Sequence, residues 1–131
     1  MTRRPLVAVV DDDESMRETM RDLLDSAGFS AVTFPSAESF LKSKRSRGVS
    51  CLITDMRMPG MTGLELHRRL AASGTSIPTV LITAYPEDHT REQALEENVV
   101  CYLAKPFPAD ELLACIRSAI EGRQNDSKGL R

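Results

Sequence analysis

The sequence predicts an α/β fold, a doubly wound parallel sheet of five strands accompanied by five helices. Two observations support this prediction. Short apolar runs alternate along the chain with longer segments whose apolar residues recur every three or four positions, which is the pattern of strands connected by helices. The length of 131 residues, with 41% hydrophobic and 27% charged residues, is also sufficient for one domain with a single core.

Five apolar runs are expected to form the strands. Each is continuously apolar or nearly so, as is typical of parallel strands that helices cover on both faces. Several of the runs are rich in Val, Ile and Thr, whose β-branched side chains favour strands. The expected strands are residues 6–10, 31–34, 51–54, 79–83 and 101–104.

The intervening segments are expected to form helices. The first helix is predicted to begin after a cap at Ser15 and to stop at Gly28, and Ser36 is predicted to cap a short second helix. A third helix follows the turn-rich loop 58–63, the fourth, residues 91–97, has little apolar face, and Pro108 or Ala109 opens the fifth. The apolar residues of the first three helices are Met16, Met20, Leu23, Leu24 and Ala27; Phe40 and Leu41; and Leu64, Leu66, Leu70 and Ala71. In the last helix, Leu112, Leu113, Ile116 and Ile120 are expected to face inward.

Residues 1–121 are expected to form the domain, and the polar residues 122–131 are expected to be a tail or linker stump. The net charge of −2 and the absence of a basic helix face argue against nucleic-acid contact by this chain. No apolar run approaches the roughly 20 residues that a membrane span requires. His67 and His89 lie alone on polar segments and are interpreted as surface residues.

The three cysteines, Cys51, Cys101 and Cys115, are too few and too scattered for a disulfide framework. They are interpreted as free thiols, largely buried in apolar runs. Free thiols are typical of a reducing, cytoplasmic setting.

Polar residues gather where the expected strands end. Asp11 and Asp12 follow the first strand, Asp55 follows the third, Thr83 ends the fourth and Lys105 follows the fifth. Parallel strands present their carboxyl ends at one edge of the sheet, where ligands bind at a switch point in strand order. Carboxylates gathered at such an edge suit Mg²⁺, and an aspartate there can accept a phosphoryl group.

Four motifs in order carry a resemblance to a known family. They are VVDDDE after the first strand, TDMRMPGMTG after the third, LITA at the fourth and YLAKPF at the fifth. The chain resembles the receiver domain of two-component response regulators over about residues 5–121, and LITDMRMPGMTGLEL and YLAKPF resemble its FixJ-like subgroup. The resemblance implies a flavodoxin-like fold of the receiver type. It also implies a signalling domain rather than an enzyme, with Mg²⁺-dependent self-phosphorylation and autodephosphorylation.

The resemblance implies roles for the residues that bind metal and phosphoryl oxygens. Asp55 would accept the phosphoryl group from a sensor histidine kinase or a histidine phosphotransfer protein. Asp12, Asp55 and the backbone carbonyl of Arg57 would hold Mg²⁺ (or Mn²⁺), with Asp11 acting through a bound water. Thr83 and Lys105 would bind the phosphoryl oxygens.

Further positions match the part of the family pattern that carries the signal onward. Tyr102, three residues before Lys105, matches the aromatic switch position, with Thr83 as the other switch residue. The Lys105–Pro106 bond is typically cis in this family. Phosphorylation would alter the face made by the fourth helix, fifth strand and fifth helix, which would then dimerise or dock a partner. Asn98 stands in a loop that usually carries Gly-Ala, and it is expected to adopt positive φ.

Two other functions fit parts of the pattern. Asp11 and Asp13 also fit the DxD motif of a haloacid-dehalogenase-type phosphatase, but the chain lacks its late acidic pair and has no room for a cap domain. Asp13 and Glu14 are instead expected at the first turn of a helix, facing its dipole. A phosphorylation-independent pseudo-receiver is disfavoured because all five polar positions are present. Both a single-domain regulator and the receiver of a longer protein remain open, since no helix-turn-helix motif follows.

Overall fold

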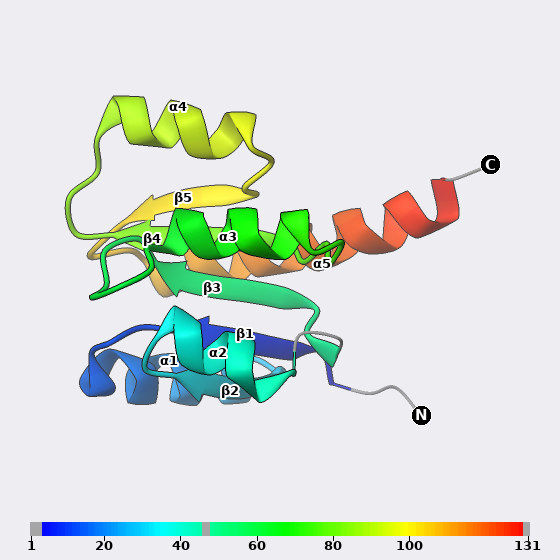
Figure 1. Ribbon diagram of the computed structural model, residues 1–131. Coiled ribbons are helices and arrows are strands. Elements are labelled where there is room, and N and C mark those ends of the chain that lie inside the picture. The colour runs from blue at the N-terminus through cyan, green and yellow to red at the C-terminus, as the bar shows by residue number, and fades with distance from the viewer. Residues whose placement is uncertain (1–3, 46–47, 130–131) are drawn as a thin grey trace.

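The computed structural model describes residues 4–45 and 48–129 (Figure 1). Its five strands form one parallel sheet in the order β2-β1-β3-β4-β5. The strands are β1 (Leu6–Val10), β2 (Ser30–Phe34), β3 (Cys51–Asp55), β4 (Thr79–Thr83) and β5 (Cys101–Ala104). The predicted doubly wound parallel sheet is therefore confirmed, and the predicted strand boundaries are correct to within one residue.

Helices cover both faces of the sheet. They are α1 (Glu14–Ser26), α2 (Ala37–Ser43), α3 (Gly63–Ala72), α4 (Asp88–Glu96) and α5 (Ala109–Gly129). α1 and α5 lie on one face, and α2, α3 and α4 lie on the other (Figure 1). α5 continues through residues 122–129, so the polar segment at the end of the sequence begins inside this helix. No helix in the described ranges is long and apolar enough to cross a membrane.

The core is divided by the sheet, because alternate strand residues point to opposite faces. On the α1 and α5 face, Val7 and Val9 pack with Leu24 and Ile116. On the α2 and α3 face, the intervening strand residues pack with Phe40, Leu66 and their neighbours. Burial on both faces explains why the strand sequences are almost continuously apolar.

The order of the strands reverses at β1, and this reversal brings the ends of β1 and β3 together. β1 pairs with β2 on one side and with β3 on the other, so β1 and β3 are neighbours although β2 lies between them in sequence. Val10, the last residue of β1, pairs with Thr54, and Asp55 follows directly. The carboxyl ends of both strands therefore lie side by side at one edge.

α1 begins two residues earlier than predicted, at Glu14 instead of after a cap at Ser15. Its N-cap is Asp13, whose Oδ1 accepts the N–H groups of Ser15 at 2.9 Å and Met16 at 3.4 Å. The prediction of Ser15 as the cap is wrong, because the carboxylate of Asp13 already satisfies the free N–H groups of the first turn. Glu14 lies in that first turn, as expected.

α4 is the least buried helix of the fold. It begins at Asp88, three residues before the predicted start, and its N-cap Glu87 makes no side-chain capping bond. Ala94 is its one fully buried residue, whereas Leu95 is 41% exposed. Asn98, just after the helix, has φ of 70°, which confirms the expected positive φ.

The structure corrects the interpretation of the cysteines. Cys101 at the start of β5 and Cys115 in α5 are paired in a disulfide, and Cys51 is a buried free thiol. The prediction of three free thiols is wrong because α5 packs across β5 and brings the two Cα atoms to 6.3 Å. Free thiols therefore no longer support a reducing setting.

Gly63, the first residue of α3, packs closely against the end of β3. A Cβ added to Gly63 would collide with the backbone oxygen of Asp55 and lie 2.9 Å from Leu81 Cδ2, whereas one added to Gly122 would meet nothing within 4 Å. Gly63→Ala is expected to lower the free energy of unfolding by about 1–3 kcal/mol through overpacking. In the control Gly122→Ala, stability is expected to be unchanged or about 0.5–1 kcal/mol higher. Urea unfolding checks this, and equal stability of Gly63→Ala and parent would contradict it.

Candidate functional site

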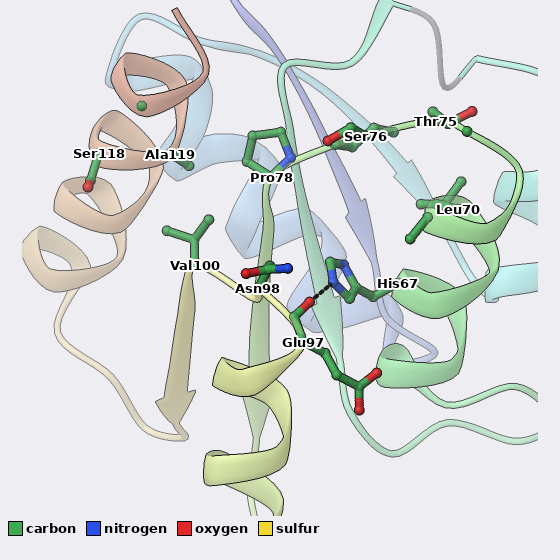
Figure 2. Close-up of a pocket in the computed structure, with 14 residues that line it drawn as sticks. His67, Leu70, Thr75, Ser76, Pro78, Glu97, Asn98, Val100, Ser118 and Ala119 are labelled. Atoms are coloured by element: carbon green, nitrogen blue, oxygen red, sulfur yellow. Dashed lines mark hydrogen bonds between the residues drawn. The ribbon is translucent and has the colours of Figure 1, made fainter. Parts of the chain in front are cut away.

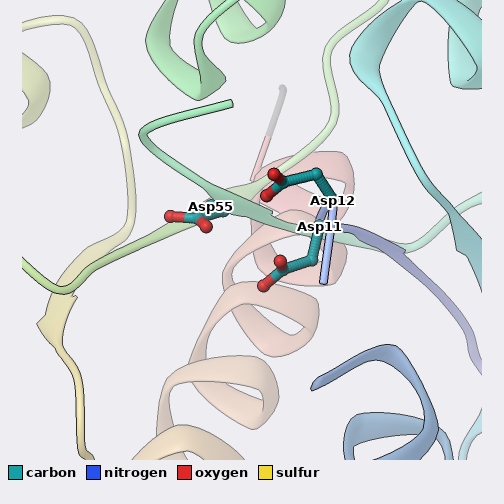
Figure 3. A group of neighbouring side chains, drawn as sticks. All are labelled: Asp11, Asp12 and Asp55. Atoms are coloured by element: carbon teal, nitrogen blue, oxygen red, sulfur yellow. The ribbon is translucent and has the colours of Figure 1, made fainter. Parts of the chain in front are cut away.

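Three carboxylates converge where β1 and β3 end (Figure 3). Asp11 and Asp12 directly follow β1, and Asp55 is the last residue of β3. Each offers an oxygen within 4.8 Å of the others. Asp11 is buried, Asp55 is partly buried and Asp12 is exposed. The group is therefore open to solvent on the Asp12 side.

Lys105 supplies positive charge to this cluster. It follows β5, and its Nζ donates to Asp11 Oδ2 at 3.3 Å and to Asp55 Oδ2 at 3.2 Å. The side chain of Lys105 is only 19% exposed, so water screens these ion pairs less than it screens surface pairs. One ammonium facing three carboxylates leaves a formal charge of −2 in the cluster.

Burial and charge shift the pKa values of this group. Desolvation raises the pKa of Asp11, although the Asp13 N–H, which Asp11 Oδ1 accepts at 2.9 Å, and Lys105 both oppose the shift. Burial alone would lower the pKa of Lys105, but the charges of Asp11 and Asp55 outweigh it and raise that pKa. Lys105 is therefore held as an ammonium between the two carboxylates.

Thr83 occupies the end of β4, the strand between β3 and β5. Its side chain is fully buried, and its Oγ1 accepts the Tyr85 N–H at 3.0 Å. The N–H of Lys105 donates to the carbonyl of Thr83 at 2.8 Å. Thr83 thus lies at the same sheet edge as Asp55 and anchors the start of the Lys105 loop.

Arg57 forms a contact network that the sequence did not predict. Its N–H donates to Asp55 Oδ1 at 3.4 Å, so its main chain lies beside that carboxylate. Its side chain pairs with Glu87 Oε1 at 3.2 Å and lies 5.2 Å from the ring centroid of Tyr85, which is 66% exposed. Arg57, Tyr85 and Glu87 lie in two separate loops of the sequence, so no local pattern indicated that they meet.

Tyr102 lies away from the carboxylates, under α4. It is 9% exposed and belongs to a cluster with Leu64, Leu81, Ala94 and Val99. Its ring therefore occupies an inward position in this structure. The Lys105–Pro106 peptide bond that follows the strand is cis.

His67 also has a role that the sequence analysis missed. Its ring, on α3, contacts β4 through Nδ1, which lies 2.9 Å from Thr79 Oγ1. Nε2 lies 2.7 Å from the carbonyl oxygen of Glu97, at the end of α4 (Figure 2). Nε2 must carry the proton, because a carbonyl oxygen can only accept. Arg68 adds a bidentate pair to the Glu97 carboxylate at 2.6 and 2.8 Å. The interpretation of His67 as a plain surface residue is wrong, since it joins α3 to the end of α4.

His67 lines a hollow of about 1080 Å³ at the amino end of β4 (Figure 2). Leu70, Pro78, Asn98 and Ala119 are among the other residues that line it. None of the three aspartates does so. The hollow lies at the opposite edge of the sheet from the acidic cluster, since parallel strands share one direction.

Comparison with known proteins places the chain in a family. Residues 7–117 match the response regulator receiver domain. The transcriptional regulatory protein FixJ of Bradyrhizobium diazoefficiens is 36% identical over 128 residues, covering 98% of this chain and 62% of that protein. The C4-dicarboxylate transport transcriptional regulatory protein DctD of Rhizobium meliloti is 36% identical over 124 residues, covering 95% and 27%. The chain thus spans less than two thirds of these relatives.

Solved structures agree with the sequence relatives. The response regulator StyR superposes with a TM-score of 0.85 at 41% identity, covering 97% of this chain and 66% of that one. The structure titled FixJ-N gives a TM-score of 0.81 at 32% identity, covering 92% and 96%. The phosphatase alternative finds no such support, and Asp13, the second aspartate of its motif, caps α1. The chain therefore belongs to the receiver domains of two-component response regulators and is similar to those of the FixJ type.

Proposed function

We propose that this chain accepts a phosphoryl group on Asp55 from a sensor histidine kinase or a histidine phosphotransfer protein. Receiver domains are signalling domains that histidine kinases phosphorylate. The observation that carries the proposal is the convergence of Asp11, Asp12 and Asp55, with the ammonium of Lys105 paired to Asp11 and Asp55. Asp55 is the proposed acceptor because it contacts Lys105 and is only partly buried at the end of β3, whereas Asp11, which also contacts Lys105, is buried.

The donor set fits a hard divalent cation. The family typically binds a divalent metal, and here three carboxylates offer oxygens within 4.8 Å of one another, with an excess negative charge. We assign Mg²⁺ (or Mn²⁺) to Asp12, Asp55 and the Arg57 backbone carbonyl, with Asp11 acting through a water. The bound cation would neutralise phosphoryl oxygens as the group transfers.

The chain's own residues supply the remaining chemistry. A carboxylate oxygen of Asp55 attacks phosphorus, and the bond from phosphorus to the donor's histidine nitrogen breaks, leaving its electron pair on that nitrogen. Lys105 already donates to Asp55, so its ammonium can turn to a phosphoryl oxygen without leaving the site. The Thr83 hydroxyl, whose oxygen accepts the Tyr85 N–H, can donate its O–H to a phosphoryl oxygen. Small phosphodonors and water can use the same groups for self-phosphorylation and autodephosphorylation.

We further propose that phosphorylation alters the face made by α4, β5 and α5. Thr83 and Tyr102 are the switch residues in this proposal, and α4 is the responsive element because so little of it is buried. The altered face would form a homodimer or dock a partner protein. The chain itself would make no direct contact with nucleic acid.

The setting and extent of this unit are part of the proposal. Residues 1–121 would form the receiver and residues 122–131 a polar tail or linker stump, whose first part continues α5. The relatives extend well beyond the matched region. A cytoplasmic location follows from the proposed kinase partner, since the phosphoryl group of a histidine kinase comes from ATP.

Changing the acceptor tests the central claim. Parent protein incubated with acetyl phosphate and Mg²⁺ should gain one acid-labile phosphoryl group by intact mass, and Asp55→Asn should gain none. Asp22→Asn, an exposed carboxylate on α1, serves as the matched control and should label like the parent. Equal labelling of Asp55→Asn and parent would exclude Asp55 and favour Asp11.

Removing one carboxylate tests the metal cluster. Repulsion between two carboxylates whose oxygens lie within 4.8 Å of one another costs about 1 kcal/mol even in a water-like medium. In chelator, Asp12→Asn should therefore melt about 3–5 °C above the parent. The parent should gain stability with rising Mg²⁺ by mass action, and the variant should gain much less. A variant that melts below the parent in chelator and is still stabilised normally by Mg²⁺ would contradict the cluster.

Amide exchange tests the switch. Phosphorylation should change exchange in residues 84–107 and leave α2 unchanged as an internal control. Thr83→Ala should still be phosphorylated on Asp55 but should lose most of the exchange difference, because no hydroxyl connects the phosphoryl group to β4. Unchanged exchange over 84–107 in fully phosphorylated parent, together with unchanged sedimentation, would refute the switch.

A further inference from the structure

Two of the three cysteines lie where a covalent bond would join different layers of the fold. Cys101 is the first residue of β5 and Cys115 lies in α5, with Cα atoms 6.3 Å apart. That separation lies within the range of about 4.4–6.8 Å that a disulfide bridges without backbone movement. Both residues are partly exposed, whereas Cys51 is fully buried in β3.

We propose that Cys101 and Cys115 form a reversible redox modification site whose oxidant is a low-molecular-weight disulfide such as glutathione disulfide. The thiolate of one cysteine attacks a sulfur of the oxidant and releases one glutathione thiolate, leaving a mixed disulfide. The second cysteine then attacks the protein sulfur and releases the other glutathione. The two protein thiols are oxidised by two electrons in total, and one glutathione disulfide becomes two glutathiones.

The packing around the pair supports reversibility. α5 is held to the sheet independently of the bond, since Leu112 and Ile116 are fully buried against Val9 and Leu103. The domain should therefore remain folded when both cysteines are reduced. The partial exposure of the two sulfur-bearing residues also gives oxidants and reductants a route to them, which thiol exchange requires.

Cys51 provides a built-in control. Desolvation by burial raises the pKa of its thiol to about 12, so it carries almost no thiolate and should not react in the folded protein. The chain thus contains one inert thiol and one reactive pair, and the two classes can be distinguished in a single experiment.

The Cys101–Cys115 bond would also reduce the response of the domain to phosphorylation, a consequence that rests on the proposed function. Tyr102 directly follows Cys101, and β5 and α5 both belong to the face proposed to respond to phosphorylation. Oxidation ties the start of β5 to α5 and should restrict movement between them. The exchange response of residues 84–107 to phosphorylation should therefore be smaller in the oxidised protein.

The experiment uses the full chain, reduced and then equilibrated in buffers of graded glutathione to glutathione disulfide ratio. Glutathione is removed by rapid gel filtration, the protein is alkylated at neutral pH with or without denaturant, and its intact mass is measured. Reduced protein should take two labels when native and three when denatured. Oxidised protein should take no label when native and one label, on Cys51, when denatured. Peptide mapping should identify the Cys101–Cys115 bond. Cys51→Ser should oxidise like the parent, and Cys101→Ser and Cys115→Ser should each stop at a mixed disulfide with one glutathione.

Three results would overturn the proposal. One is a full set of three thiols at excess glutathione disulfide, and another is oxidation that joins separate molecules or involves Cys51. The third is a bond that resists excess reductant until the protein is unfolded, which would make it structural rather than reversible. The parent's own redox titration decides these outcomes even if a serine variant fails to fold. The fraction of phosphorylated protein is measured separately, by intact mass of the reduced protein. Failure of Asp55 phosphorylation therefore cannot be mistaken for failure of the thiol site.

Discussion

Repulsion among carboxylates at the ends of β1 and β3 is the constraint on which the rest of the site depends. Parallel pairing of these strands sets Asp11, Asp12 and Asp55 side by side, and the apolar core that drives the pairing keeps them there. Helix N-termini follow the strands at the same edge, and their positive ends favour negative charge. The fold therefore holds a negative cluster that its own local electrostatics only partly offset.

Lys105 offsets part of the remaining charge, and its position explains several features of the chain. The lysine comes from β5, two strands away from β3, so its long side chain spans the end of β4 to reach both Asp11 and Asp55. The loop that carries it is anchored to Thr83 through the backbone. A change at Asp55 thus acts on a cation whose main chain is bonded to the end of β4, which couples the carboxylate edge to β4 and β5.

The sequence predicted what depends on one element at a time, and it failed where several elements meet. Strand positions followed from apolar runs, and the gathering of Asp11, Asp55 and Lys105 at one edge followed from parallel topology alone. The Cys101–Cys115 pair and the bridging role of His67 depend on how α5 and α3 pack over the sheet, which spacing does not encode. The Asp13 cap was missed for a local reason, since Asp13 and Ser15, two positions apart, are both good capping residues and the structure uses the first.

The attachment of α4 gives the physical basis for a response at a distance. Its C-terminal end is held by polar contacts, with His67 on the Glu97 carbonyl and Arg68 on the Glu97 carboxylate. Its N-terminal end has no side-chain cap, and Glu87 instead pairs with Arg57, whose N–H contacts Asp55. A helix with one end held by polar contacts and little buried apolar surface can move at modest cost, because little apolar surface must be re-exposed. Contacts from Asp55 through Arg57 to Glu87 connect the carboxylate edge to the start of α4, and because the Arg57–Glu87 pair is exposed to water it holds that end of the helix only weakly.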